Sequence, residues 1–79
     1  MKEWKERNDG RIELRFGRTA AIIITRTKPK FYNTQLWVLD KLYAQDNFVK
    51  LDEAKMHGLQ MLKEFRDRVA EDLRDIGAE

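Results

Sequence analysis

The stretch AAIII at residues 20–24 is apolar at every position, and so is the stretch LWVL at residues 36–39. Successive side chains of a strand point to opposite faces of its sheet, so both stretches are apolar on both faces. Only one long helical pattern follows them, and one helix covers one face of a small sheet. The other face therefore needs a second covering, and we expect a partner molecule to provide it.

The residues before the first apolar stretch predict antiparallel strands joined by tight turns. The NDG sequence at residues 8–10 is a turn signal, and residues 2–7 before it predict a short edge strand. Arg11–Phe16 alternates polar and apolar side chains, as a strand with one solvated face does. A second turn at Gly17-Arg18 leads to the β-branched strand at Thr19–Thr27.

The residues after that strand are expected to be less regular. Residues 28–34 predict the longest loop of the chain, and Gln35–Asp40 predicts the third core strand, with a possible continuation toward Tyr43. Residues 44–47 are expected to be a polar connection. Phe48 is expected to anchor the chain before the helix.

Apolar residues then recur at helical spacing along one stripe. They are Leu51, Ala54, Gly58, Leu62, Phe65, Val69, Leu73 and Ile76. The pattern predicts a helix over residues 51–77, with Asp52 and Glu53 complementing the dipole of its first turn. The whole chain is thus expected to be a single α+β domain over residues 1–79. It consists of an antiparallel meander of three or four strands within residues 11–43, an edge strand within 1–10, and one long C-terminal helix packed on one face.

The predicted helix is longer than the predicted sheet. About 26 helical residues span roughly 40 Å, whereas a six-residue strand spans roughly 20 Å. Either a second chain covers the protruding part of the stripe, or the helix breaks near Gly58 and folds back. We expect a homodimer, whose interface contains Phe65, Val69, Leu73 and Ile76.

Composition excludes several functional classes. The 79 residues contain no cysteine and no serine, the four glycines are dispersed, and His57 is the only histidine, expected to be exposed on the helix. These features predict no enzyme, no cofactor and no metal site. No apolar run is long enough to span a membrane and the N-terminus lacks the apolar core of a signal peptide, so we expect a cytoplasmic protein.

Charge is distributed unevenly between the two halves of the chain. Residues 1–50 hold eleven Lys and Arg against six Asp and Glu, a net of +5, and residues 51–79 hold five against eight, a net of −3. The basic sheet half suits phosphates or an acidic protein surface, although solvation alone also explains such charges.

Two features are candidates for partner recognition. The first combines cations with adjacent aromatic side chains between the second and third core strands, namely Arg26, Lys28, Lys30, Phe31 and Tyr32. Such a set suits nucleic acid, where aromatics stack on bases, or a protein interface. Alternatively the loop is solvated, with Phe31 in the core.

The second feature is Trp37. If Leu36 and Val38 face the helix, Trp37 lies on the open face of the sheet with Leu39, near Ile23 and Arg15. In the reversed register Trp37 is in the core. A further possibility is that Trp4 covers the open face from within the same chain.

The segments Leu36-Trp37-Val38 and Phe48–Lys55 (FVKLDEAK) resemble a pattern in small proteins of phages and mobile elements. The layout is also similar to that of integrase arm-binding domains, which read DNA with the open face of a sheet, but the middle strand here is rich in isoleucine. The phage resemblance implies a non-enzymatic protein that binds and inhibits a host defence or nucleic-acid-processing protein in the host cytoplasm. The alternative is a small nucleic-acid-binding protein that uses the basic, aromatic loop together with Arg15 and Trp37.

Overall fold

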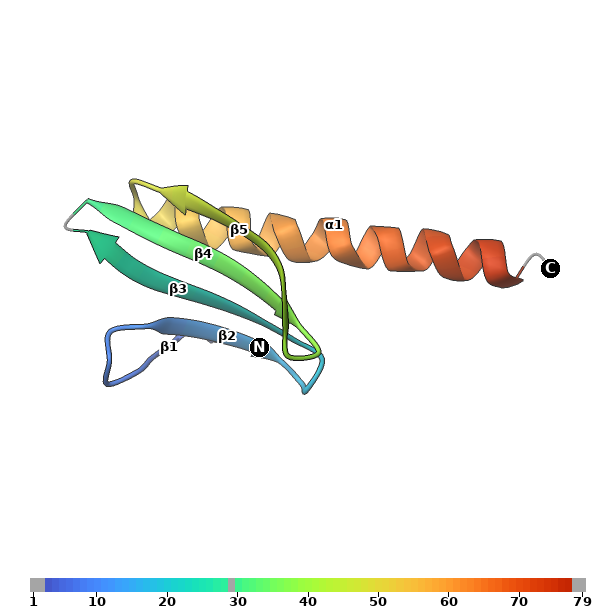
Figure 1. The fold of residues 1–79 in the computed structure, drawn as a ribbon, viewed down its shortest axis with the longest axis horizontal. Coiled ribbons are helices and arrows are strands. Elements are labelled where there is room, and N and C mark those ends of the chain that lie inside the picture. Colours follow the sequence, from blue (N-terminus) through green and yellow to red (C-terminus); the bar gives the residue numbers. More distant parts are fainter. Residues whose placement is uncertain (1–2, 29, 78–79) are drawn as a thin grey trace.

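The computed structural model describes residues 3–28 and 30–77, which form five strands and one helix (Figure 1). The elements are β1 (Lys5–Glu6), β2 (Ile12–Phe16), β3 (Ala20–Lys28), β4 (Phe31–Val38), β5 (Lys41–Phe48) and α1 (Leu51–Gly77). The strands form one antiparallel sheet in the order β1-β2-β3-β4-β5. The predicted α+β class, with a meander followed by one long C-terminal helix, is confirmed.

Alternation along the paired strands gives the sheet two distinct faces. The face packed against α1, called here the helix-side face, carries the core residues Ile12, Leu14, Ala20, Ile22, Ile24, Thr34 and Leu36. Ile22 lies in register between Leu14 and Leu36, and both Ile22 and Leu36 are completely inaccessible to solvent. Because the helix covers only this face, the core is a single layer between α1 and the sheet (Figure 1).

The sheet is larger than predicted because β5 was not foreseen. The prediction that the sheet ends near Tyr43 and that residues 44–47 are a connection is wrong. β4 and β5 are joined by a two-residue turn in which Leu39 and Asp40 have positive φ angles of 51° and 66°. Such turns usually contain Asn-Gly or a related pair. Leu39-Asp40 gives no such signal, and the edge strand that follows is mostly exposed, so its sequence lacks an apolar face.

The prediction of a long loop over residues 28–34 is also wrong. β3 continues to Lys28, and β4 begins directly opposite it at Phe31. A register shift between Arg26 and Lys28 accommodates the extra residue Thr27, and pairing continues at Lys28 and Phe31. Asn33 and Thr34, within the predicted loop, are paired strand residues.

A second irregularity, in β5, extends the contact between the sheet and the helix. Leu36 pairs with Ala44 and Trp37 pairs with Leu42, so Tyr43 is an additional residue in β5. Its ring meets Phe65 of α1 edge-on, with the ring centres 4.9 Å apart. The bulge thus turns Tyr43 toward the helix, where strict alternation would send it to the other face.

The helix is continuous through Gly58, so the alternative in which it breaks there and folds back is excluded. A Cβ atom at Gly58 would lie 2.7 Å from Cγ2 of Ile22 and 3.1 Å from Cγ2 of Thr34. Ala54 lies one helical turn before Gly58, and its carbonyl accepts a hydrogen bond of 3.2 Å from the hydroxyl of Thr34. The absence of a side chain at Gly58 therefore allows α1 to lie directly on β3 and β4.

Gly58→Ala is expected to lower the free energy of unfolding by up to about 2 kcal/mol. The added methyl overpacks a closed contact, which costs about 1–3 kcal/mol, and alanine recovers about 1 kcal/mol of helix propensity. Urea denaturation followed by circular dichroism measures the difference. In an Ile22→Ala background, which removes the clashing Cγ2, the same replacement is expected to be neutral or stabilising. An equal loss in both backgrounds would show that Ile22 does not set the approach of the helix.

Candidate functional site

The face of the sheet opposite α1 is called here the open face. It is formed by Lys5, Glu13, Arg15, Ala21, Ile23, Thr25, Asn33, Gln35, Trp37, Leu42, Gln45 and Asn47. Within residues 3–28 and 30–77, the buried stripe of α1 packs on the helix-side face of the sheet. No described element therefore packs over the open face, as the single layer of helix in Figure 1 shows.

Trp37 lies at the centre of a row of side chains that crosses four strands of the open face. Arg15 pairs with Ala21, Ala21 with Trp37, and Trp37 with Leu42. Ala21 is buried although no element covers it, since it lies between two much larger cross-strand neighbours. Trp37 is half-buried and Leu42 is 41% exposed, so the row presents an apolar strip to solvent.

Amide side chains border this strip on β4 and β5. The indole Nε1 of Trp37 donates a hydrogen bond of 2.9 Å to Oε1 of Gln35, which fixes the plane of the ring. Gln35 donates to Gln45 at 3.4 Å, and Asn33 donates to Asn47 at 3.1 Å. The open face thus has a rigid aromatic centre with a neutral, polar border.

A hollow of about 290 Å³ lies beside Trp37 at the end of the sheet where two turns meet. Arg15 and Arg18 line it on the side of β2, and Leu39 and Asp40 line it on the side of the β4–β5 turn. The amide of Leu39 donates a 2.8 Å hydrogen bond to the carbonyl of Thr19, which holds the two turns together. An apolar floor with charged groups around it suits a single side chain of a protein ligand.

Charged residues of the open face gather along the edge formed by β1 and β2, where Lys5 lies in register with Glu13 and two arginines surround the same carboxylate. Glu13 is buried, and its Oε2 lies 2.8 Å from Nε of Arg7 and 3.5 Å from Nε of Arg15. The hydrogen bond from Arg7, with the charges of Arg7 and Arg15, holds the pKa of Glu13 below its ordinary value of 4.5, although burial opposes this. One carboxylate balances one of the two guanidinium charges, so this edge of the open face keeps a net positive charge.

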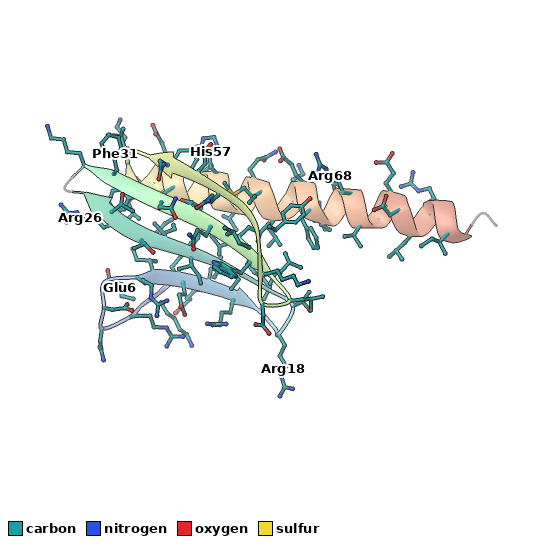
Figure 2. The ribbon with its side chains drawn as sticks, viewed as in Figure 1. Glu6, Arg18, Arg26, Phe31, His57 and Arg68 are labelled. Atoms are coloured by element: carbon teal, nitrogen blue, oxygen red, sulfur yellow. The ribbon has the colours of Figure 1, made fainter. Side chains whose placement is uncertain are left out.

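The residues predicted to form one nucleic-acid surface are divided by the structure. Arg15 and Trp37 lie together on the open face, and Arg18 is in the turn beside them. Arg26 and Phe31 lie at the opposite end of the sheet from Arg18 (Figure 2). Tyr32 belongs to the helix-side face, where it packs against the core. Phe31 and Trp37 are six positions apart along β4, which corresponds to roughly 20 Å.

The other cations of that predicted set lie near Phe31. Lys30 and Phe31 are both exposed. The alternative in which Phe31 packs in the core is therefore wrong. The backbone of Lys28 pairs with Phe31, but the prediction for the Lys28 side chain lies outside what the structure describes.

Trp4 does not cover the open face, contrary to one of the expected arrangements. It is half-buried against the core on the helix side, and Nζ of Lys55 on α1 lies 5.7 Å from the centre of its ring. The register with Leu36 and Val38 toward the helix is the one observed. Leu42 was missed as a member of the Trp37 surface, because only the unforeseen turn at Leu39-Asp40 brings β5 beside β4.

The predicted dimer residues lie on one stripe of α1, and their exposure rises along it. Phe65 is half-buried under Tyr43, Val69 is 37% exposed, Leu73 60% and Ile76 68%. A groove of about 310 Å³ runs beside the first two, between Leu62, Phe65 and Val69 on α1 and Phe16 and Ala20 on the sheet. Beyond Val69 the helix continues past the sheet (Figure 1).

The single histidine is exposed on α1, as predicted, and stacks on Phe48 with ring centres 4.5 Å apart. Among residues 3–28 and 30–77, no three His, Cys, Asp or Glu side chains are grouped so as to hold a metal ion. In the same part of the chain, no helix is long and apolar enough to cross a membrane.

No protein-family model, no curated protein and no solved structure matches this chain. The resemblance of Phe48–Lys55 to small phage proteins therefore stays a prediction.

Glu13 is expected to make the stability of the fold depend on pH in the acid range. Its pKa in the folded protein is below the unfolded value, so its ionised form contributes stability above about pH 4.5, and this contribution is lost as the pH falls through the lowered pKa. Between about pH 5 and pH 3, the free energy of unfolding should fall more in the wild type than in Glu13→Gln.

Denaturant unfolding at a series of pH values measures this difference. Glu6→Gln, which removes an exposed carboxylate from the neighbouring strand, is the matched control and should follow the wild-type curve. Arg7→Met should move the acid transition to higher pH because it removes the donor to Glu13. Parallel curves for the wild type and Glu13→Gln would contradict the assignment.

Proposed function

We propose that this chain is a non-enzymatic protein-binding module that binds its partner with the open face, centred on Trp37. The observation that carries the proposal is the position of that tryptophan. It is held by Gln35 and flanked by Ala21, Ile23 and Leu42, on a face that no described element covers. Protein interfaces have this composition, with an aromatic anchor among apolar neighbours and a polar border.

The charges of the open face favour a protein over a nucleic acid as the partner. Nucleic acids are bound mainly through cations that follow the phosphate backbone. The described open-face residues of β3, β4 and β5 are apolar or neutral polar, and the cations beside β2 share the buried carboxylate of Glu13. The nucleic-acid alternative is supported by the cations at the β1–β2 edge, which outnumber the carboxylate of Glu13. Its other supports, Arg18 and Phe31 with the adjacent Lys30, lie at opposite ends of the sheet (Figure 2).

The resemblance of Phe48–Lys55 to small phage proteins extends the proposal to an inhibitor that occupies a site on a host protein. Inhibition by occupancy requires a rigid surface and no chemistry. The hydrogen-bonded Trp37 and the paired amides of β4 and β5 provide such a surface.

Peptide display against the immobilised chain tests whether the open face is a protein-binding surface. A panel of independent binders from a randomised library is measured on single variants. Trp37→Ala is expected to raise the Kd at least about 30-fold for the predominant group of binders, and Leu42→Ala by several-fold, because anchors at the centre of an interface contribute most of the affinity. Leu59→Ala is the matched control: Leu59 is 44% exposed, against 41% for Leu42, but lies on α1.

Two results would contradict the proposal. One is a panel that binds Trp37→Ala, shown to be folded by circular dichroism, as tightly as the wild type. The other is tight binding of mixed-sequence single- or double-stranded oligonucleotides by fluorescence anisotropy, with an affinity that falls steeply as salt is raised. The second result would favour the nucleic-acid alternative.

A further inference from the structure

We propose that the apolar stripe of α1 beyond the sheet is covered by a second copy of this chain, packed antiparallel about a two-fold axis close to Val69 and Ala70. The stripe consists of Leu62, Phe65, Val69, Leu73 and Ile76, and is called here the overhanging stripe. The inference concerns the opposite side of the molecule from the open face, so the two proposals are tested separately.

The overhanging stripe continues the stripe that the sheet already buries. From Leu51 onward the apolar positions follow a repeated spacing of three, four and four residues, so that Leu51, Leu62 and Leu73 are equivalent. Eleven residues correspond to three turns at about 3.67 residues per turn, close to a straight helix, so the stripe keeps the same direction along its length. Ala54 and Gly58 in the first repeat are buried by the sheet, whereas Leu73 and Ile76 are mostly exposed. The same surface thus passes from a protein environment into water.

The groove beside α1 has the right place to receive the end of a second helix. Antiparallel pairing about Val69 puts Leu73 of the second copy opposite Phe65, and its Ile76 opposite Leu62. Phe65 and Leu62 of the first copy line its groove, together with Phe16 from the sheet. The exposed end of each helix is therefore covered by the groove of the other copy, and both ends are covered at once because the arrangement is symmetric.

Charges along the border of the stripe are complementary in this arrangement. Arg68 and Asp72 are one helical turn apart on the same border of the stripe, and both are exposed. About an axis close to Val69 and Ala70, Arg68 of each copy faces Asp72 of the other, which gives two ion pairs. In a parallel pair this border of one copy would lie on the opposite side of the interface from the same border of the other copy, so these two ion pairs would not form.

Two further features are consistent with pairing between two copies of α1. Residues 62–77 hold four cations against five anions, so two copies repel each other little. Arg68 currently bonds only the neutral hydroxyl of Tyr43 in the described structure, at 3.4 Å, which leaves it free to bond a carboxylate of a second copy. Antiparallel pairing also directs the two sheets to opposite ends, where they do not meet.

Sedimentation equilibrium at micromolar concentration is the first test, and the wild type is expected to have twice the mass of one chain. Leu73→Asp is expected to raise the dissociation constant at least about 30-fold, because it places a charge in the centre of the interface. Met56→Asp is the matched control: Met56 is 61% exposed, against 60% for Leu73, but lies on the outer side of α1, and its mass should be that of the wild type. A wild type with the mass of one chain would overturn the proposal and leave the stripe to a different partner.

Charge exchange tests the antiparallel register. Arg68→Asp and Asp72→Arg are each expected to weaken self-association several-fold, since each puts like charges opposite one another. Mixing the two variants should restore association as a heterodimer, in which both pairs are complementary. If neither variant associates more weakly than the wild type, the register is wrong.

Cross-linking distinguishes the two directions, and the chain contains no cysteine of its own. Val69→Cys, at the axis, should form an intermolecular disulfide on mild oxidation. Ile76→Cys should not, since its two copies are separated by roughly 20 Å along an antiparallel pair. Efficient cross-linking at both positions would indicate a parallel pair and overturn the proposal.

Discussion

The contact between Gly58 and Ile22 is the constraint on which the rest of the structure depends. Because no side chain intervenes, α1 lies close enough to β3 and β4 for Thr34 to bond the carbonyl of Ala54. That approach orients the first half of the helix along the sheet and buries its stripe there. The position of the first half also sets the direction of the second half, because α1 is one continuous helix. Its eleven-residue apolar repeat is close to the period of a straight helix.

One helix fixed to one face leaves two surfaces with different chemistry. The open face has Trp37 and hydrogen-bonded amides at its centre, with charges along the β1–β2 edge and around the hollow at one end. The overhanging stripe is aliphatic and aromatic, bordered by charges of both signs. A hydrogen-bonded, partly polar surface suits a partner that binds and leaves, whereas a continuous apolar stripe suits a lasting contact, because exposure to water costs it more.

The sequence was sufficient where a pattern had one interpretation. The helix, the turn at Asn8-Asp9-Gly10 and the alternating strand that became β2 were predicted, since each has a distinct period or turn signal. It was insufficient where a pattern had two. A stretch apolar at every position, such as the one that contains Trp37, does not say which side faces the helix, and only the packed structure decides. β5 was missed because Leu39-Asp40 adopts a turn conformation that its side chains disfavour. The row of side chains from Arg15 to Leu42 depends on that turn, so it could not be predicted from the sequence.

The two surfaces are compatible with each other in space and differ in what they contribute. Pairing uses the second half of α1, and the open face lies on the other side of the sheet from the first half, so neither contact covers the other. In an antiparallel pair the two sheets lie at opposite ends, each with its Trp37 row free. Such a molecule binds two sites at once when a partner is itself symmetric or repeated, and the second contact then forms at a high effective concentration. Under that condition, a modest apolar strip on each sheet is sufficient for firm binding.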